Sequence, residues 1–103
     1  MRTVDGFINC KNGTHFTASF TVDGVNYNYV GSLGNSVPPF KCFNATLEFN
    51  QPRDLTSTHL FEGRIGPEEL EITLANKVKI TGTLNMPISP GGSVSGSGSW
   101  SQN

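Results

Sequence analysis

The sequence predicts an all-β fold, a small antiparallel β-sandwich or barrel of about eight strands that are largely connected by hairpins. Three observations lead to this prediction. Only 35% of the 103 residues are hydrophobic and 15% are charged, and Gly, Ser, Thr and Asn, which are weak helix formers, fill much of the difference. Short runs alternate between apolar and polar residues, as half-buried strands do, and turn signals separate them. No segment combines a helical period with capping residues.

Length and charge limit what the protein does. We expect residues 1–103 to form a single β domain. The net charge is −1 and no basic run is present, which disfavours nucleic acid and acidic membrane surfaces as partners. No apolar stretch approaches the roughly 20 residues of a transmembrane segment, and the N-terminus lacks the apolar segment of a signal peptide. We therefore expect a cytoplasmic or non-classically secreted protein, with an extracellular mature form as the alternative.

The first predicted hairpin covers residues 4–20. A three-residue loop of Lys11, Asn12 and Gly13, with Gly13 in the left-handed conformation, pairs Ile8 with Phe16. A two-residue Asn-Gly turn would instead mix the two faces of the hairpin. In the favoured register the inward face also collects Val4, Gly6, Ala18 and Phe20.

The second hairpin turns at Asp23-Gly24, a dipeptide typical of the type I′ turn. This turn pairs Phe20 with Tyr27 and Ala18 with Tyr29. Tyrosines beside asparagines, as in "NYNY", are also typical of sugar-binding surfaces, but this register places both rings on the apolar face. The opposite face collects an uncharged set of hydroxyl and amide groups: Thr17, Ser19, Thr21, Asn26 and Asn28.

The next strand is predicted in "KCFNATLEF", where Phe43, Ala45, Leu47 and Phe49 share one face. Cys42 then lies on the other face, whereas Cys10 lies on the inward face of the first hairpin. Because the two thiols point in opposite directions, we expect them to be unpaired rather than bonded in a disulfide.

Two further hairpins share the strand that contains Ile72. A turn at Pro67-Glu68 pairs Ile65 with Leu70, and a loop over residues 75–77 pairs Ile72 with Ile80. The segments "LGNSVPPF", "NQPRDLTST" and "MPISPGG" are too irregular for strands, so we expect them to cross or cap the sheets.

Residues 90–103 are rich in Gly and Ser and allow two interpretations. Such composition is typical of a flexible tail. However, Val94, Gly96, Gly98 and Trp100 alternate with serines, which is typical of a closing strand that another backbone approaches closely.

No pattern predicts catalysis or metal binding. GxSxG, HExxH, P-loop and Cys/His zinc spacings are all missing from the sequence. The carboxylates around Glu69 are followed by lysines on the next strand, and cross-strand ion pairs explain this pattern better than a glycosidase pair does. We therefore predict a non-enzymatic protein without metal or cofactor.

The uncharged polar composition favours a lectin-like, carbohydrate-binding module whose partner is a neutral glycan or glycoprotein. Trp100 would stack on a sugar face, and Asn50, Arg53 and Asp54 in the "NQPRDLT" loop would bind sugar hydroxyls. The competing interpretation places Trp100 in the hydrophobic core. A lectin gains from avidity because single sugar sites are weak, so we also expect a homo-oligomer.

The alternative function comes from another class: a protein-interaction or structural β domain, such as a secreted effector or toxin. Such a domain would dock through a sheet edge or through an outward apolar residue such as Phe7.

Overall fold

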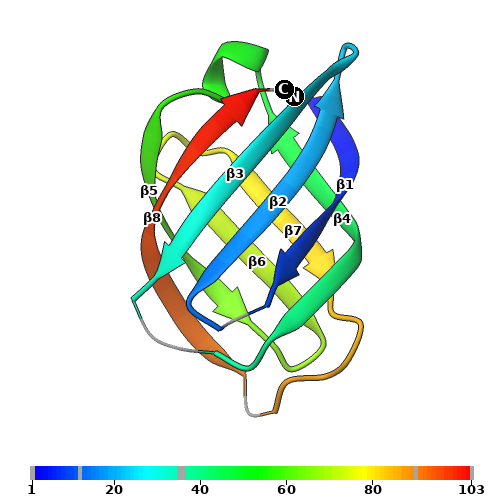
Figure 1. Ribbon diagram of the computed structural model, residues 1–103, viewed down its shortest axis with the longest axis vertical. Coiled ribbons are helices and arrows are strands. Elements are labelled where there is room, and N and C mark those ends of the chain that lie inside the picture. The colour runs from blue at the N-terminus through cyan, green and yellow to red at the C-terminus, as the bar shows by residue number, and fades with distance from the viewer. Residues whose placement is uncertain (1, 12, 35–36, 90, 103) are drawn as a thin grey trace.

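The computed structural model describes residues 2–11, 13–34, 37–89 and 91–102, and within them eight antiparallel strands form a closed barrel (Figure 1). The predicted all-β class is therefore confirmed, and of the two predicted architectures the barrel is the one observed. The strands are β1 (Arg2–Cys10), β2 (His15–Val22), β3 (Val25–Leu33), β4 (Phe40–Phe49), β5 (Thr58–Ile65), β6 (Glu69–Leu74), β7 (Lys79–Thr83) and β8 (Gly92–Gln102), with a short 3₁₀ turn, η1 (Pro52–Asp54), after β4.

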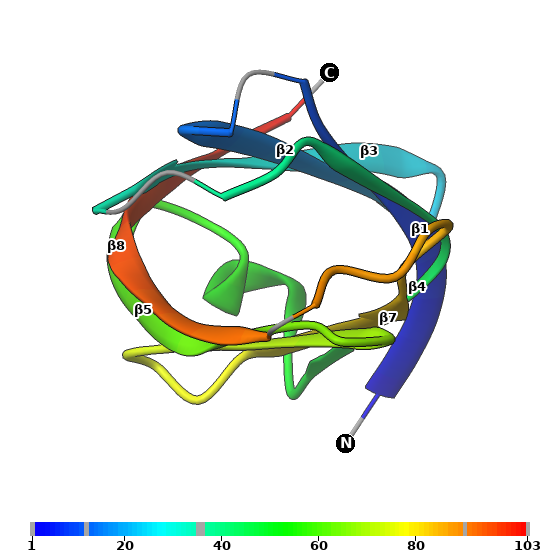
Figure 2. The same cartoon turned by 90° about the horizontal axis from the view of Figure 1, so that it is seen from below.

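Around the ring the strands follow the order β1-β2-β3-β8-β5-β6-β7-β4, and β4 closes on β1 (Figure 2). The ring consists of two Greek keys, β4-β1-β2-β3 and β8-β5-β6-β7, each with its fourth strand beside its first. The connections from β3 to β4, β4 to β5 and β7 to β8 join strands that are not neighbours, so they cross the barrel ends, as the sequence predicted. We call the end that holds η1 and the β2–β3 turn the upper end, as in Figure 1.

Three of the four predicted hairpin registers are confirmed. The β2–β3 ladder pairs Phe20 with Tyr27, and both residues of its turn have positive φ, 52° at Asp23 and 80° at Gly24. The β5–β6 and β6–β7 ladders also match the predicted pairs, including Ile65 with Leu70 and Ile72 with Ile80.

The β1–β2 register differs from the prediction by two residues. Ile8 pairs with Ala18 and Gly6 pairs with Phe20, because the connection between the strands is longer than the predicted three-residue loop. The inward face is unchanged, since a shift of two residues preserves the alternation of side chains. Asn12 of the predicted loop lies outside the described residues.

The predicted faces of β4 are wrong at its start. The β1–β4 register changes between the pairs Gly6–Ala45 and Ile8–Cys42, so β4 holds one extra residue at that point, a β-bulge. Cys42 is consequently buried and Phe43 is exposed, the reverse of the prediction. Both cysteines are free and buried, so unpaired thiols are observed although the argument from opposite faces fails.

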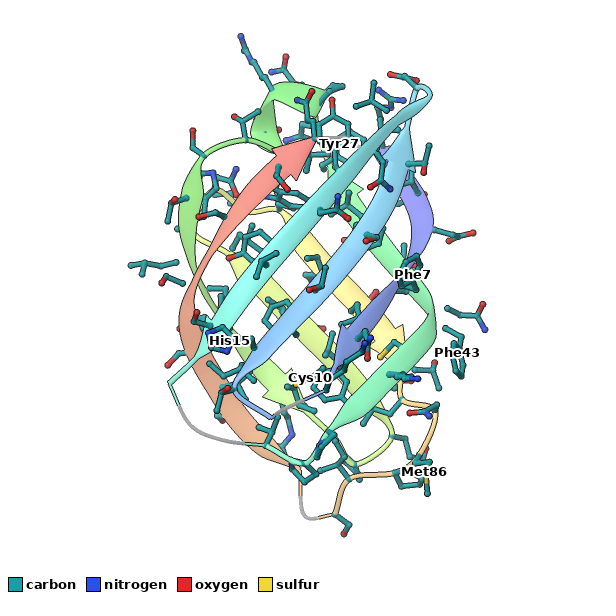
Figure 3. All side chains as sticks on the ribbon, in the orientation of Figure 1. Phe7, Cys10, His15, Tyr27, Phe43 and Met86 are labelled. Carbon is teal, nitrogen blue, oxygen red and sulfur yellow. The ribbon has the colours of Figure 1, made fainter. Side chains whose placement is uncertain are left out.

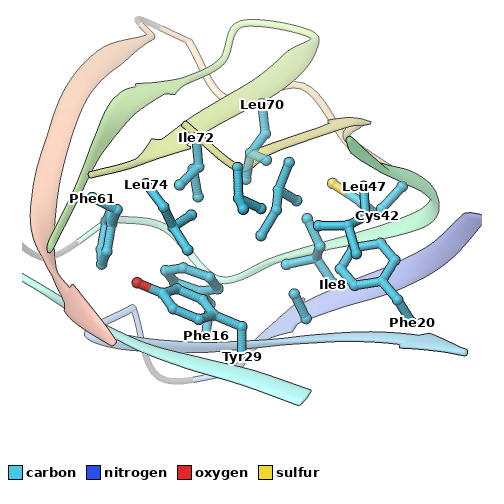
Figure 4. Packing of buried hydrophobic residues seen from close by; sticks show 14 of the residues in the cluster. Ile8, Phe16, Phe20, Tyr29, Cys42, Leu47, Phe61, Leu70, Ile72 and Leu74 are labelled. Atoms are coloured by element: carbon cyan, nitrogen blue, oxygen red, sulfur yellow. The ribbon is translucent and has the colours of Figure 1, made fainter. Parts of the chain in front are cut away.

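Phe16, Tyr29 and Phe61 pack together on one side of the barrel interior (Figure 4), and Trp100 packs on Tyr29. Tyr29 is fully buried, and its ring lies 5.9 Å from Phe16, 6.2 Å from Phe61 and 5.0 Å from Trp100, measured between centroids. Its hydroxyl donates to the carbonyl of His59 at 3.0 Å. The predicted inward position of Tyr27 and Tyr29 is therefore confirmed. An eight-stranded barrel has room inside for side chains of this size, which here form its core.

The Gly/Ser-rich segment forms a closing strand, not a tail. Residues 92–102 are β8, which pairs with β3 on one side and β5 on the other. Val94, Gly98 and Trp100 are buried and the serines between them face outward, as their alternation predicted. Pro90 and Asn103, also part of that segment, lie outside the described residues.

Candidate functional site

The four residues predicted to bind sugar, Trp100, Asn50, Arg53 and Asp54, all lie at the upper end of the barrel. Arg53 and Asp54 belong to η1 and Asn50 directly follows β4. The backbone N–H of Trp100 donates to the carbonyl of Ser57 at 3.1 Å, which fixes the end of β8 beside this connection.

Their side chains point in different directions. The indole of Trp100 packs on Tyr29 inside the barrel and is only 8% exposed. The carboxylate of Asp54 accepts the backbone N–H of Gln51 at 3.1 Å, so it caps the 3₁₀ turn. Asn50 and Arg53 are exposed. The predicted sugar-binding role of these residues at the loop end stays a prediction. Most of the Trp100 side chain is already buried against other residues and is not open to a ligand.

One side of the barrel wall is free of formal charge. The strands β2, β3 and β8 are neighbours in the ring and contain no Asp, Glu, Lys or Arg. The predicted uncharged set lies on the outer surface of this wall, where the hydroxyl of Ser19 donates to Asn28 and the amide of Asn28 donates to Asn26 at 2.8 Å. The serines of β8 extend the same surface toward β5, where Ser99 and Thr58 share a hydrogen bond of 2.8 Å.

A hollow of about 890 Å³ opens on this wall where β8 lies between β3 and β5. It forms because β8 has only Ser and Gly there, whereas β5 and β6 on its side carry longer side chains, which project further from the wall. The backbone at its borders is fixed: Gly34 N–H donates to the carbonyl of Ser95, and Ala75 N–H donates to that of Leu60, both at 2.9 Å. The lining residues are Ser32, Leu33, Gly34, Leu60, Phe61, Glu62, Thr73, Leu74, Ala75, Lys77, Ser95, Gly96 and Ser97.

The hollow continues toward the lower end of the barrel. A second depression of about 650 Å³ shares Glu62, Thr73 and Ser95 with the first and adds Glu71 and Ser93. The two hollows together form an outer groove, which we call the β8 groove. It offers hydroxyl donors and acceptors along its floor, the apolar side chain of Leu60, which is 67% exposed, and carboxylates at one end.

Sequence reasoning missed this groove. It identified the alternation of Ser with Gly in β8, but it could not show which strands flank β8, because those pairings join segments far apart in the chain. A row of small side chains forms a groove only when the neighbouring strands carry longer side chains. The tertiary fold determines which strands those are.

Three exposed apolar side chains lie on the opposite side of the barrel (Figure 3). Phe7 on β1 is 53% exposed, Phe43 on β4 is 68% exposed, and Met86 after β7 is 69% exposed. Phe7 was predicted to face outward, whereas Phe43 does so only because of the bulge in β4.

Among the described residues, three buried groups have a pKa raised by burial: Tyr29, Cys42 and Cys10. Burial raises the pKa of Tyr29 to about 12 and the pKa of Cys42 to about 11, because the low dielectric of the core disfavours their anions. Burial also raises the pKa of Cys10. These groups are therefore neutral around pH 7.

Among the described residues there is no cluster of three or more His, Cys, Asp or Glu side chains that could hold a metal ion. The same residues include no helix with the length and apolar character required to span a bilayer. No family model, no curated protein and no solved structure is significantly similar to this chain.

Proposed function

We propose that this protein binds a neutral carbohydrate in the β8 groove. The observation that carries the proposal is a hollow that has serine hydroxyls of β8 on its floor and the exposed side chain of Leu60 beside them, and whose charged residues, Glu62 and Lys77, lie only on its β5 and β6 side. A neutral sugar offers many hydroxyls and no charge, so it hydrogen-bonds to the serines without an ion of its own losing its hydration.

The apolar contact in this site comes from Leu60 rather than from an aromatic ring. Sugars carry patches of C–H groups, and Leu60 stands beside the serine hydroxyls of β8 with most of its side chain exposed. The site proposed here therefore differs from the loop-end site that the sequence predicted, because the ring of Trp100 packs inside the barrel. Glu62 and Lys77 at the border of the hollow offer charge-assisted hydrogen bonds to individual hydroxyls.

The proposal is tested by titrating the protein with a panel of neutral oligosaccharides (maltohexaose, cellohexaose, chitohexaose and a mannan fragment) and following backbone amide shifts by NMR. We expect saturable shifts in β8 and β5. Leu60→Ala should weaken binding about tenfold, as expected for the loss of roughly 1.4 kcal/mol of apolar contact. Val30→Ala is the matched control, because Val30 is also exposed but does not line the hollow.

A third variant separates the groove from the loop end. Arg53→Ala leaves a groove-bound sugar unaffected, whereas a loop-end site would lose an important hydrogen-bonding group. If the panel and a broad glycan array both give no binding with folded protein, the carbohydrate proposal is wrong.

The protein-interaction class is the second candidate, and one observation favours it: the exposed side chains of Phe7, Phe43 and Met86. Aromatic residues and Met are enriched where proteins meet. One of the two predicted docking modes does not fit the fold, because a closed barrel has no free sheet edge. An outward apolar patch remains available to this class.

A further inference from the structure

The outer face of β1 and β4 carries an aromatic pair with charges of opposite sign on its two sides. The bulge in β4 lies where the pairing changes from Gly6–Ala45 to Ile8–Cys42, so Phe7 on β1 is next to Phe43 on β4. Both rings are more than half exposed, and Figure 3 shows both on the same side of the barrel.

The register fixes what lies above and below this pair. Toward the upper end, Asp5 pairs with Thr46. Toward the lower end, Asn9 pairs with Lys41. Asp5 and Lys41 are both exposed. Along the strand direction this face therefore carries an acidic side chain, then the aromatic pair, then a basic side chain. We call this set (Asp5, Phe7, Phe43 and Lys41) the aromatic strip.

The two charges have equal spacing from the aromatic pair. Asp5 lies two residues from Phe7, and Lys41 lies two residues from Phe43 in the opposite direction, which is about 7 Å in each case at the rise of a β-strand. A two-fold axis through the aromatic pair, lying parallel to the barrel wall and running across the strands, would therefore bring each Asp5 next to the partner's Lys41. A partner of different sequence would have no need for this symmetry.

We propose that a second copy of the chain covers the aromatic strip, in a two-fold symmetric dimer. Phe7 and Phe43 pack against the same rings of the other copy, and two Asp5–Lys41 pairs flank them. The contact repeats identically on both copies, so the assembly closes at two subunits.

The segment after β7 completes the surface. Asn85 donates its backbone N–H to the carbonyl of Lys41 at 2.9 Å and accepts the N–H of Lys41 at 3.1 Å through its side chain. These bonds hold the segment before Met86 against the start of β4, and Met86 and Phe43 both line a hollow of about 380 Å³ that leaves room for a side chain of the second copy. Two strands and this segment bury on the order of 1,000 Å² in total, at the low end for specific interfaces, so we expect a weak dimer.

The dimer is independent of the proposed carbohydrate function. In the ring, β1 and β4 lie three or four strands away from β8 and β5, so the strip and the β8 groove are on opposite sides of the barrel (Figure 1). The two grooves of a dimer would therefore face away from each other and could bind two ligands at once.

Sedimentation equilibrium of the full chain, over a concentration range of about 5 μM to 1 mM, tests the proposal. We expect a monomer–dimer equilibrium with a dissociation constant on the order of 10–100 μM. Phe43→Asp should abolish the dimer. Leu60→Asp, at an equally exposed apolar residue on the opposite side, should leave it unchanged.

Charge exchange tests the two-fold geometry itself. Asp5→Lys and Lys41→Asp should each weaken dimerisation by tenfold or more, because like charges then meet across the axis. An equimolar mixture of the two variants should dimerise again, since each copy then offers the charge that the other lacks. Circular dichroism verifies that every variant is folded.

A wild-type protein that stays monomeric at 1 mM, or a dimer that tolerates Phe43→Asp, overturns the proposal. A dimer lost in both single charge variants but not restored in their mixture overturns the two-fold arrangement. None of these outcomes depends on oligosaccharide binding, which is measured separately on Leu60→Ala.

Discussion

The indole of Trp100 shows what a single buried side chain contributes to this barrel. It packs on Tyr29 next to the end of β8, and within the described residues its Nε1 has no hydrogen-bond partner. A buried N–H without a partner costs free energy, so the ring stays in the core because of its apolar area.

We predict that Trp100→Ala lowers the free energy of unfolding by about 3–5 kcal/mol, the usual cost of deleting a large core aromatic. Trp100→Phe should cost much less, because it keeps a ring and removes the unpaired N–H. Urea unfolding followed by far-ultraviolet circular dichroism measures both variants. Normal stability in Trp100→Ala, combined with loss of sugar binding, would instead support the stacking role predicted from the sequence.

Single positions were predictable where the alternation of side chains is regular. The inward face of β8 follows from its sequence, and so does the inward position of Tyr29. The faces of Cys42 and Phe43 were predicted wrongly, because unbroken alternation along "KCFNATLEF" puts Phe43 on the apolar side with the residues that follow it. The bulge that decides between them depends on pairing with β1, more than 30 residues away in the sequence.

At the scale of the strands, glycine determines how closely the barrel wall packs on its core. A Cβ atom added at Gly98 would lie 2.5 Å from the ring of Tyr29 and 2.6 Å from the carbonyl oxygen of Val30. At Gly92, at the start of the same strand, the added atom would have no neighbour within 4 Å. The position of the aromatic cluster therefore depends on a missing side chain in β8.

We predict that Gly98→Ala destabilises the protein by about 1–3 kcal/mol or more, because neither the ring nor the neighbouring backbone has room to move. Gly92→Ala is the control in the same strand and should change the unfolding free energy by less than about 0.5 kcal/mol. Chemical denaturation of both variants provides the measurement. Equal stability of the two would mean that β8 shifts outward easily.

The hairpins were predictable to the extent that their turns are short. Asp23-Gly24 leaves one register for β2 and β3, and the register is as expected. The longer connection between β1 and β2 allowed two registers with the same inward face, and alternation alone does not distinguish them.

For the whole molecule, the choice between sandwich and barrel depends on contacts that no local pattern encodes. The ladders between β3 and β8 and between β4 and β7 join the two Greek keys, and they close the ring. The sequence predicted the strands themselves but not these two ladders. The β8 groove and the aromatic strip, which depend on which strands are neighbours, were unpredictable for the same reason.

We predict that the barrel loses stability at alkaline pH. The pKa of Cys42 is about 11 in the fold against 9.0 for a free thiol, and that of Tyr29 is about 12 against 10.0. Because both values are raised, this contribution is complete below pH 9 and is lost as the pH rises toward 11 and 12.

Urea midpoints measured from pH 7 to pH 12 test this prediction. The midpoint should be nearly constant up to pH 9 and then fall steadily. In Cys42→Ala the decline should be smaller between pH 9 and 11. A midpoint that stays constant up to pH 12 would contradict the buried, neutral state of both groups.

Closure of the ring also determines how the molecule can open. Each of the eight strands is bonded on both sides, so detaching one strand breaks two ladders at once, whereas an open sheet can fray from its edge. Low-energy motion is then confined to the connections at the two ends. A ligand on the outer wall would meet atoms that are already in place, so binding there would cost little conformational entropy.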